Sequence, residues 1–150
     1  VWSVRVPMNG TVDFITFIPD YELSTEKARA ALPQKVAHHD AVFNLARAAL
    51  LAGSLTTGKL ENVGVAVGDC LHQPYRFDLI PGGRDVVHAA KCMGALGAFI
   101  SGAGPSIIAV VDSADKTYLS RAQMYCEQNF PHWTPIRLTC DEVGATVTRF

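Results

Sequence analysis

The chain has 150 residues, of which 49% are hydrophobic and 18% are charged. This composition is typical of one globular domain rather than of a disordered segment. Its 13 Lys and Arg against 14 Asp and Glu give a net charge of -1, so there is no basic surplus to neutralise a nucleic-acid backbone. No uncharged apolar run approaches the ~20 residues that cross a bilayer, and the first residues lack the order of a signal peptide. The sequence therefore predicts a protein that binds neither nucleic acid nor membrane.

The cysteines predict a reducing compartment. No two of them have the short spacing of zinc ligands or of a redox pair. We expect free thiols that serve mainly as small core residues in a cytoplasmic protein, namely Cys70, Cys92, Cys126 and Cys140. The histidines form no ligand pair on one helix face, so no metal site is predicted from them.

The predicted elements follow hydrophobic periodicity and the residues that cap or break helices. Alternation of apolar residues and enrichment in β-branched and aromatic residues indicate the strands, and Gly53 is the expected end of the longest helix. In chain order we expect a strand at 11–17, a helix at 25–32 capped by Ser24 or Thr25, a helix at 36–52, a weak helix at 60–71, a loop at 72–76, a helix at 84–93, strands at 96–100 and 107–111, a helix from Asp112 or Ser113 to 129, and strands at 133–139 and 145–150.

This order of strands and helices predicts an α+β fold. Several strand pairs are close enough in sequence to form hairpins, and helices separate the others. We expect a ferredoxin-like α/β sandwich, in which helices cover one face of an antiparallel sheet. One domain accounts for residues 1–150.

The loop between the two predicted central strands is the most informative segment. Its glycines allow positive φ and close backbone approach, so that successive N–H groups can hold an anion. A glycine-rich hairpin turn explains the same residues and is favoured when the loop is considered alone. The loop consists of Ser101, Gly102, Ala103, Gly104, Pro105 and Ser106.

Three polar side chains lie at positions where a ligand contact and a structural role are both plausible. Arg76 lies in a predicted loop and Arg137 in a predicted strand with apolar neighbours. An arginine at such a position either extends over the core or binds a carboxylate or phosphate with its planar guanidinium. Asn44 interrupts an apolar helix and needs a hydrogen-bond partner. Taken alone, each is better explained by a structural role.

The order of five segments resembles the C-terminal half of homoserine kinases, which belong to the GHMP kinase superfamily. The resemblance covers about residues 12–147. It is carried by residues 17–29 (FIPDYELSTEKAR), 32–33 (LP), 40–44 (DAVFN), 72–76 and 79–82 (HQPYR and LIPG), and 94–106 (GALGAFISGAGPS).

The resemblance implies ATP-dependent phosphorylation of the L-homoserine hydroxyl, a step of threonine biosynthesis. It implies that Arg76 and Arg137 hold the carboxylate of the amino acid, and that Asn44 helps to fix the substrate. Residues 101–106 correspond to the third superfamily motif, which packs beside the phosphate-binding loop. Because the guanidinium can pair with a carboxylate through two hydrogen bonds, arginine suits this role better than lysine.

The sequence departs from the family pattern in two ways. Ala41 stands where family members often have a histidine, and His38 and His39 lie nearby. The family's ATP-phosphate loop and its Mg²⁺-binding carboxylate belong upstream of this region, and these 150 residues contain no such loop. We therefore expect ATP and Mg²⁺ to be bound mainly by an N-terminal half outside this chain, and the chain alone to be inactive.

Two alternatives stay open beside the kinase interpretation. One is a free-standing amino-acid-binding or regulatory domain without catalysis, which further upstream sequence with a glycine-serine loop would exclude. The other is a structural or dimerising domain, a homodimer included. Convergence of Arg76 and Arg137 on one cavity would argue against that second alternative.

Overall fold

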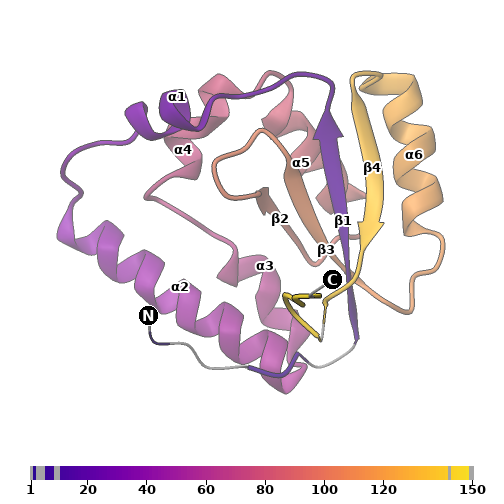
Figure 1. Ribbon diagram of the computed structural model, residues 1–150, viewed down its shortest axis with the longest axis horizontal. Helices are drawn as coiled ribbons and strands as arrows, with labels where there is room; N and C mark the ends of the chain where they lie inside the picture. Colours follow the sequence, from indigo (N-terminus) through magenta and orange to yellow (C-terminus); the bar gives the residue numbers. More distant parts are fainter. Residues whose placement is uncertain (1, 3–5, 9–10, 142, 149–150) are drawn as a thin grey trace.

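The computed structural model describes residues 2, 6–8, 11–141 and 143–148. Its centre is a four-stranded antiparallel sheet of order β2-β3-β1-β4 (Figure 1). The strands are β1 (Val12–Pro19), β2 (Gly97–Ile100), β3 (Ile107–Asp112) and β4 (Trp133–Leu138). This order, with helices between β1 and β2 and between β3 and β4, is that of the predicted ferredoxin-like sandwich. The α+β class is confirmed.

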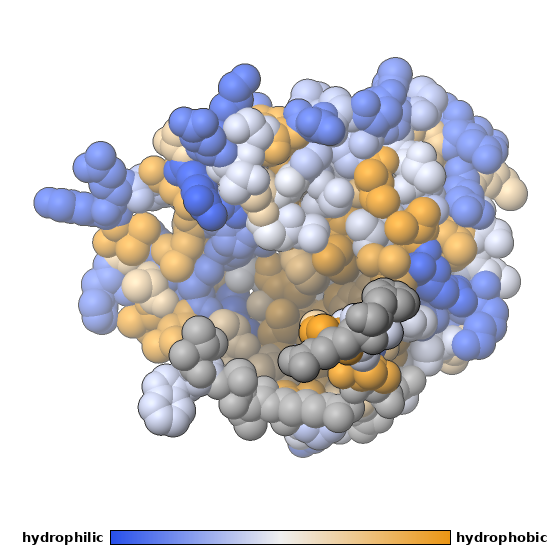
Figure 2. All heavy atoms as spheres, in the orientation of Figure 1, coloured by the Kyte–Doolittle hydropathy of each residue, from blue (hydrophilic) through white to orange (hydrophobic). Residues whose placement is uncertain are grey.

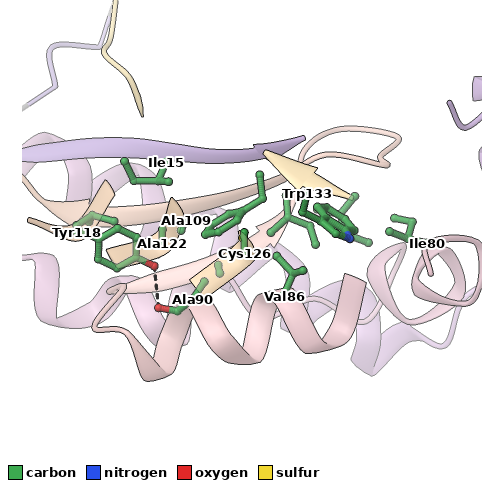
Figure 3. Close-up of a cluster of buried hydrophobic side chains, with 14 residues drawn as sticks. Ile15, Ile80, Val86, Ala90, Ala109, Tyr118, Ala122, Cys126 and Trp133 are labelled. Carbon is green, nitrogen blue, oxygen red and sulfur yellow. Dashed lines mark hydrogen bonds between the residues drawn. The ribbon is translucent and has the colours of Figure 1, made fainter. Parts of the chain in front are cut away.

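Two helices cover one face of the sheet. The helix α5 (Gly83–Cys92) packs on β2 and β3, and α6 (Tyr118–Asn129) packs on β4. Alternate residues of the strands, such as Ile15 and Ala109, point into this layer and are fully buried. The hydroxyl of Tyr118 donates to the Ala90 carbonyl at 2.8 Å, which satisfies the one polar group that this ring brings into the core (Figure 3).

The opposite face of the sheet is covered only in part. Val12 and Val110 point to this side and pack with Val63 from α3 (Val63–Ala66) and with side chains of the long helix α2 (His38–Thr57). Towards β4 the same face is open in the sense that no described helix covers it, and Ile136 and Leu138 are 37% and 45% exposed. The shorter helical segments are α1 (Thr25–Ala30), η1 (Leu60–Asn62), α4 (Gln73–Arg76) and η2 (Phe77–Leu79).

Helix α2 runs past Gly53, the predicted end, and stops at Gly58. A glycine inside a helix costs about 1 kcal/mol, but Leu51 and Leu55 on either side of Gly53 pack against the second core cluster. Gly58 adopts φ +75°, and its N–H donates to the Ser54 carbonyl at 2.9 Å. Packing therefore outweighs the local preference, and the left-handed glycine sets the end of the helix.

Other predicted boundaries also differ from the structure. The helix predicted at 60–71 ends at Ala66, and the predicted loop at 72–76 contains α4. Helix α6 begins at Tyr118 because Asp112 and Asp115 accept backbone N–H groups two residues ahead and hold the chain in turns. Residues 145–148 form no strand, and 149–150 lie outside the described residues.

The prediction that the cysteines are free thiols in the core is confirmed only in part. All four are free thiols, but Cys126 alone is buried in the core, where burial raises its pKa to about 11. Cys70 is half-buried, and Cys92 and Cys140 are exposed.

Candidate substrate site

A hollow lies between α2 and the covered part of the sheet (Figure 2). It contains a cavity of about 160 Å³ whose wall is formed by α2 on one side and by the chain between α3 and α4 on the other. Phe99 of β2 reaches the cavity from the sheet face opposite α5 and α6. The polar lining residues are Asn44, Arg47, Asp69, His72 and Gln73.

Asp69 organises the polar side of this cavity. Its carboxylate accepts the backbone N–H groups of Leu71 at 3.1 Å, His72 at 2.9 Å and Gln73 at 2.6 Å. These donors belong to the start of α4, where backbone N–H groups have no partner within the helix. Asp69 thus acts as a capping residue, and it explains why the predicted longer helix breaks here.

Asn44 connects α2 to this capped turn. Its side-chain nitrogen donates to Asp69 Oδ1, and its oxygen accepts the N–H of Cys70 at 2.9 Å. The expected partner of the mid-helix asparagine is therefore the turn at 69–70. Both ends of the amide are used there, one as donor and one as acceptor, so Asn44 holds the turn in place at the edge of the cavity.

The hydrogen bonds decide the charge of Asp69. Burial works to raise the pKa of its carboxyl, but the bonds from Asn44 and from the N–H groups of Gln73, His72 and Leu71 together lower it. The ionised form of the Asp69 carboxyl is thus favoured. It accepts four hydrogen bonds, which is about the number of acceptor positions that a carboxylate has.

We expect the Asp69 cap to make the protein sensitive to acid. Because the native pKa lies below the ordinary 3.8, the stabilisation is present above the ordinary value and is lost as pH falls through the native one. The measurement is the unfolding free energy of wild type and Asp69→Asn between about pH 6 and pH 2. The variant should be less stable at neutral pH and should lose less stability on acidification. Parallel pH curves for the two proteins would contradict this role.

Gln73 fixes α4 against the edge of the sheet. Its side chain accepts the Ile100 N–H at 3.1 Å and donates to the Val67 carbonyl at 3.3 Å, and the residue is 8% exposed. Since β2 is an edge strand, Gln73 takes the place of a strand partner at this point. The turn that carries His72 and Arg76 is therefore attached to both α2 and β2.

Arg76 lies at the end of this turn, beside the glycine-rich loop. Its Nη1 donates to the Gly102 carbonyl at 2.6 Å and lies 3.4 Å from Nδ1 of His72. Its Nε reaches the Ala28 carbonyl at 3.4 Å. Among the described acidic side chains, none forms an ion pair with Arg76. Its charge is thus available to an anionic ligand.

His72 is held in the neutral form. Burial lowers the pKa of its imidazole and the nearby Arg76 cation lowers it further, while the Asp69 carboxylate opposes both. The net shift is downward, so at neutral pH the ring is uncharged.

The loop at 101–106 is a tight turn whose glycines have different surroundings. The Ser101 N–H donates to the Ser106 carbonyl, and the Gly104 N–H donates to the Ser101 carbonyl. Gly102 has φ +55° and open space around it. Gly104 has φ +86°, and a Cβ there would lie 2.8 Å from Ile80 Cδ1 and 3.3 Å from Ile100 Cγ2. The loop therefore faces the core at Gly104 and Arg76 at Gly102.

Arg137 is not brought to this site. It pairs with Ile15 in the sheet register, so it points to the face that α5 and α6 cover, and its Nε lies 3.6 Å from Asp13 Oδ2. The hollow lies on the opposite face, and β4 and β2 are opposite edges of the sheet, about 14 Å apart at ~4.8 Å per strand step. Arg76 and Arg137 thus do not converge on one cavity.

Sequence reasoning missed four polar residues of the cavity: Arg47, Asp69, His72 and Gln73. The capping role of Asp69 had a local signal, because the acidic residue precedes a short segment with Pro74 in its first turn. The position of Arg47 had none, since it depends on how α2 crosses the sheet.

The described residues contain no group of three or more His, Cys, Asp or Glu that could hold a metal ion. Among the helices of this part of the chain, none is both long and apolar enough to cross a membrane.

The fold and the comparison with known families define the class of protein to which this chain belongs. The family described as GHMP kinases C terminal matches residues 46–128, more than half of the chain. The chain belongs to this family. Its relatives include homoserine kinases of Clostridium botulinum (strain Alaska E43 / Type E3), 36% identical over 97% of this chain, and of Caldicellulosiruptor bescii, 45% identical over 96%. The chain spans 49% and 48% of the length of these two proteins.

Solved structures agree with this assignment. A homoserine kinase from Cytophaga hutchinsonii superposes with a TM-score of 0.80 at 29% identity, over 90% of this chain and 43% of that chain. A 4-(cytidine 5'-diphospho)-2C-methyl-D-erythritol kinase superposes with a TM-score of 0.54 at 13% identity, over 89% of this chain and 43% of that chain, which shows the shared fold.

Proposed function

We propose that this chain is the substrate-side half of a cytoplasmic homoserine kinase, which transfers phosphate from ATP to the L-homoserine hydroxyl in threonine biosynthesis. The observation that carries the proposal is Arg76, which has no acidic partner among the described residues. Arg76 does not itself line the cavity, but it is held by the Gly102 carbonyl and lies 3.4 Å from the ring of His72, which does. Relatives that are homoserine kinases along 96–97% of this chain support the choice of substrate.

In this proposal the residues of the hollow bind and orient the amino acid. Arg76 pairs with the substrate carboxylate, and Asn44 and Asp69 hold the turn from which Arg76 extends. Residues 101–106 support the phosphate-binding loop of an upstream half and fix Arg76 through Gly102. Arg137 has Asp13 as its ion-pair partner on the other face, and we assign it a structural role.

The residues described here do not fit the phosphates or the magnesium ion. They include no metal-binding group of three or more ligands, and the sequence has no loop of the Gly-Lys-Ser/Thr type. We propose that ATP and Mg²⁺ are bound by an N-terminal half that precedes this chain in the full-length enzyme.

Exposed apolar side chains support docking of such a half. Val42 and Leu45 on α2 are 52% and 73% exposed, and Ile136 and Leu138 are exposed on the open sheet face. A contiguous exposed apolar patch is typical of an interface, and we propose that the upstream half covers these side chains. The additional length of the relatives provides the polypeptide that would cover it.

The test is a phosphorylation assay with the full-length protein and with residues 1–150 alone. With ATP, Mg²⁺ and L-homoserine, the full-length protein should form O-phospho-L-homoserine, detected by phosphorus NMR. Residues 1–150 should form none, because phosphoryl transfer depends on charge neutralisation and positioning around the phosphates. Turnover by residues 1–150, or a full-length protein inactive on homoserine, would contradict the proposal.

A further inference from the structure

A second cavity, of about 430 Å³, lies at the end of the sheet where β1 ends and β4 begins. Trp133 lines this cavity at one end of the core cluster (Figure 3), on the sheet face that α5 and α6 cover. The hollow beside α2 lies on the opposite face, so the two cavities are separate. Pockets that bind small molecules span about 300–1,000 Å³. The second cavity is therefore large enough for a ligand of its own.

The walls of this cavity are mainly apolar and aromatic. Tyr21 and Trp133 stand at right angles, with an interplanar angle of 89° and ring centres 6.3 Å apart. The ring of Phe130 and two prolines, Pro81 and Pro131, complete the apolar lining. Perpendicular aromatic rings can present their faces to one cation, as in the cages that bind quaternary ammonium groups. The walls therefore suit an organic cation as well as a neutral apolar group.

The charged groups at this cavity favour the cation. Asp20 lines it, and Nδ1 of His132 lies 2.7 Å from Asp20 Oδ2. Among the described residues His132 is the one side chain that contacts Asp20, so Oδ1 stays open to a ligand. The Asp20 N–H donates to the His132 carbonyl at 2.9 Å, which fixes the carboxylate at the rim. Of the described residues that line the cavity, none is lysine or arginine.

The C-terminal end of α6 adds partial negative charge to the same cavity. Helix α6 ends at Asn129, and Asn129, Phe130 and Pro131 line the cavity. The last carbonyls of a helix carry partial negative charge, which a basic residue in the last turn can offset. In α6 no residue of the last turn is basic. The Phe130 N–H donates to the Cys126 carbonyl at 2.8 Å, but Pro131 has no N–H to offer to the Glu127 carbonyl.

We infer that this cavity binds a small organic ammonium ion with an apolar body. The apolar part lies against Tyr21 and Trp133, and the charged nitrogen lies toward Asp20 and the end of α6. An anion would be repelled by the carboxylate and by the helix carbonyls. A neutral apolar molecule would contact the same rings but would gain nothing from the charges. Preference for a positive charge is therefore the property that distinguishes this site, and it does not depend on the proposed function.

The test compares two probes of the same shape on the full-length protein. Choline carries a quaternary ammonium group, and 3,3-dimethylbutan-1-ol has a neutral carbon in its place. Titrations at constant ionic strength follow the indole N–H signal of Trp133 by NMR, assigned through its absence in Trp133→Phe. Choline should shift this signal saturably and bind about 3- to 30-fold more tightly than the alcohol, the range for a cation over an aromatic face.

Two variants test the two parts of the site. Asp20→Asn keeps the shape of the carboxyl group and should lower the preference for choline by about 2- to 5-fold, the range of an exposed ion pair. Tyr21→Leu keeps an apolar side chain and should also lower the preference, because the cation loses one aromatic face. Asp78→Asn is the matched control, because Asp78 is exposed and paired with Arg84 at 3.0 Å but does not line the cavity. It should keep the wild-type preference.

Each outcome decides the inference. A preference for choline that falls in Asp20→Asn and in Tyr21→Leu, and stays in Asp78→Asn, would support it. Equal affinity of the wild type for the two probes would show a merely apolar pocket and overturn the inference. An unchanged Trp133 signal in choline would overturn it as well, and so would a preference that both variants retain in full. Phosphorylation of homoserine is measured separately, so the proposed function stands or falls on its own assay.

Discussion

Replacing Gly104 by valine should destabilise the full-length protein and lower its turnover per folded molecule. Gly104 has φ +86°, a conformation that costs a side-chain-bearing residue about 1–3 kcal/mol. The new Cβ would also lie 2.8 Å from Ile80 Cδ1, and Ile80 is only 2% exposed, so it cannot move into solvent. Overpacking of this kind typically costs a further 1–3 kcal/mol, roughly.

The effect on turnover follows from the position of Gly102 in the same loop. Its carbonyl accepts the hydrogen bond from Arg76, so a shift of the loop moves the proposed substrate-binding cation. Gly102→Val is the matched control for the steric clash, because Gly102 also has positive φ but a Cβ there would have nothing within 4 Å. Urea denaturation and turnover of the folded protein measure both effects. A folded Gly104→Val enzyme with normal turnover would show that the loop is only a turn.

Arg76→Ala should raise the KM for homoserine by about 30-fold or more, which corresponds to roughly 2 kcal/mol or more of lost binding. The substitution removes a charge-assisted bond to the substrate carboxylate, and ATP affinity should change little. Arg137→Ala should instead lower the melting temperature and leave the KM unchanged, because its partner is Asp13. A wild-type KM in Arg76→Ala would contradict our assignment of Arg76. A raised KM in folded Arg137→Ala would show that Arg137 takes part in substrate binding.

The elements that carry a strong periodic pattern could be predicted from the sequence. The alternation around Ile15 and Phe17 identified β1, and the helical spacing of Ala122 and Cys126 identified the inner face of α6. Both patterns reflect one large core, so local preference and tertiary packing agree there.

The boundaries were wrong where tertiary contacts or side-chain caps override local preference. Gly53 does not end α2, because leucines on both sides of it pack on the sheet. The chain at 67–72 is not helical, because the Asp69 carboxylate accepts hydrogen bonds from the N–H groups at the start of α4. Neither effect is visible in helical periodicity.

The candidate site could be predicted only in part for a similar reason. The family resemblance located Asn44, Arg76 and the loop at 101–106, which the structure connects through Asp69, His72 and Gly102. It could not show that the side chain of Arg137 points to the other face, because that depends on the register of β4 against β1. Arg47 was missed as a residue of the cavity wall because its position there depends on the packing of α2 beside Gly68.

The most direct measurement of the central claim is a crystal structure of the full-length protein with L-homoserine bound. We expect the amino acid in the hollow between α2 and β2, with its carboxylate within hydrogen-bond distance of Arg76. Homoserine bound elsewhere, or a carboxylate held by Arg137 on the α6 side of the sheet, would contradict the account.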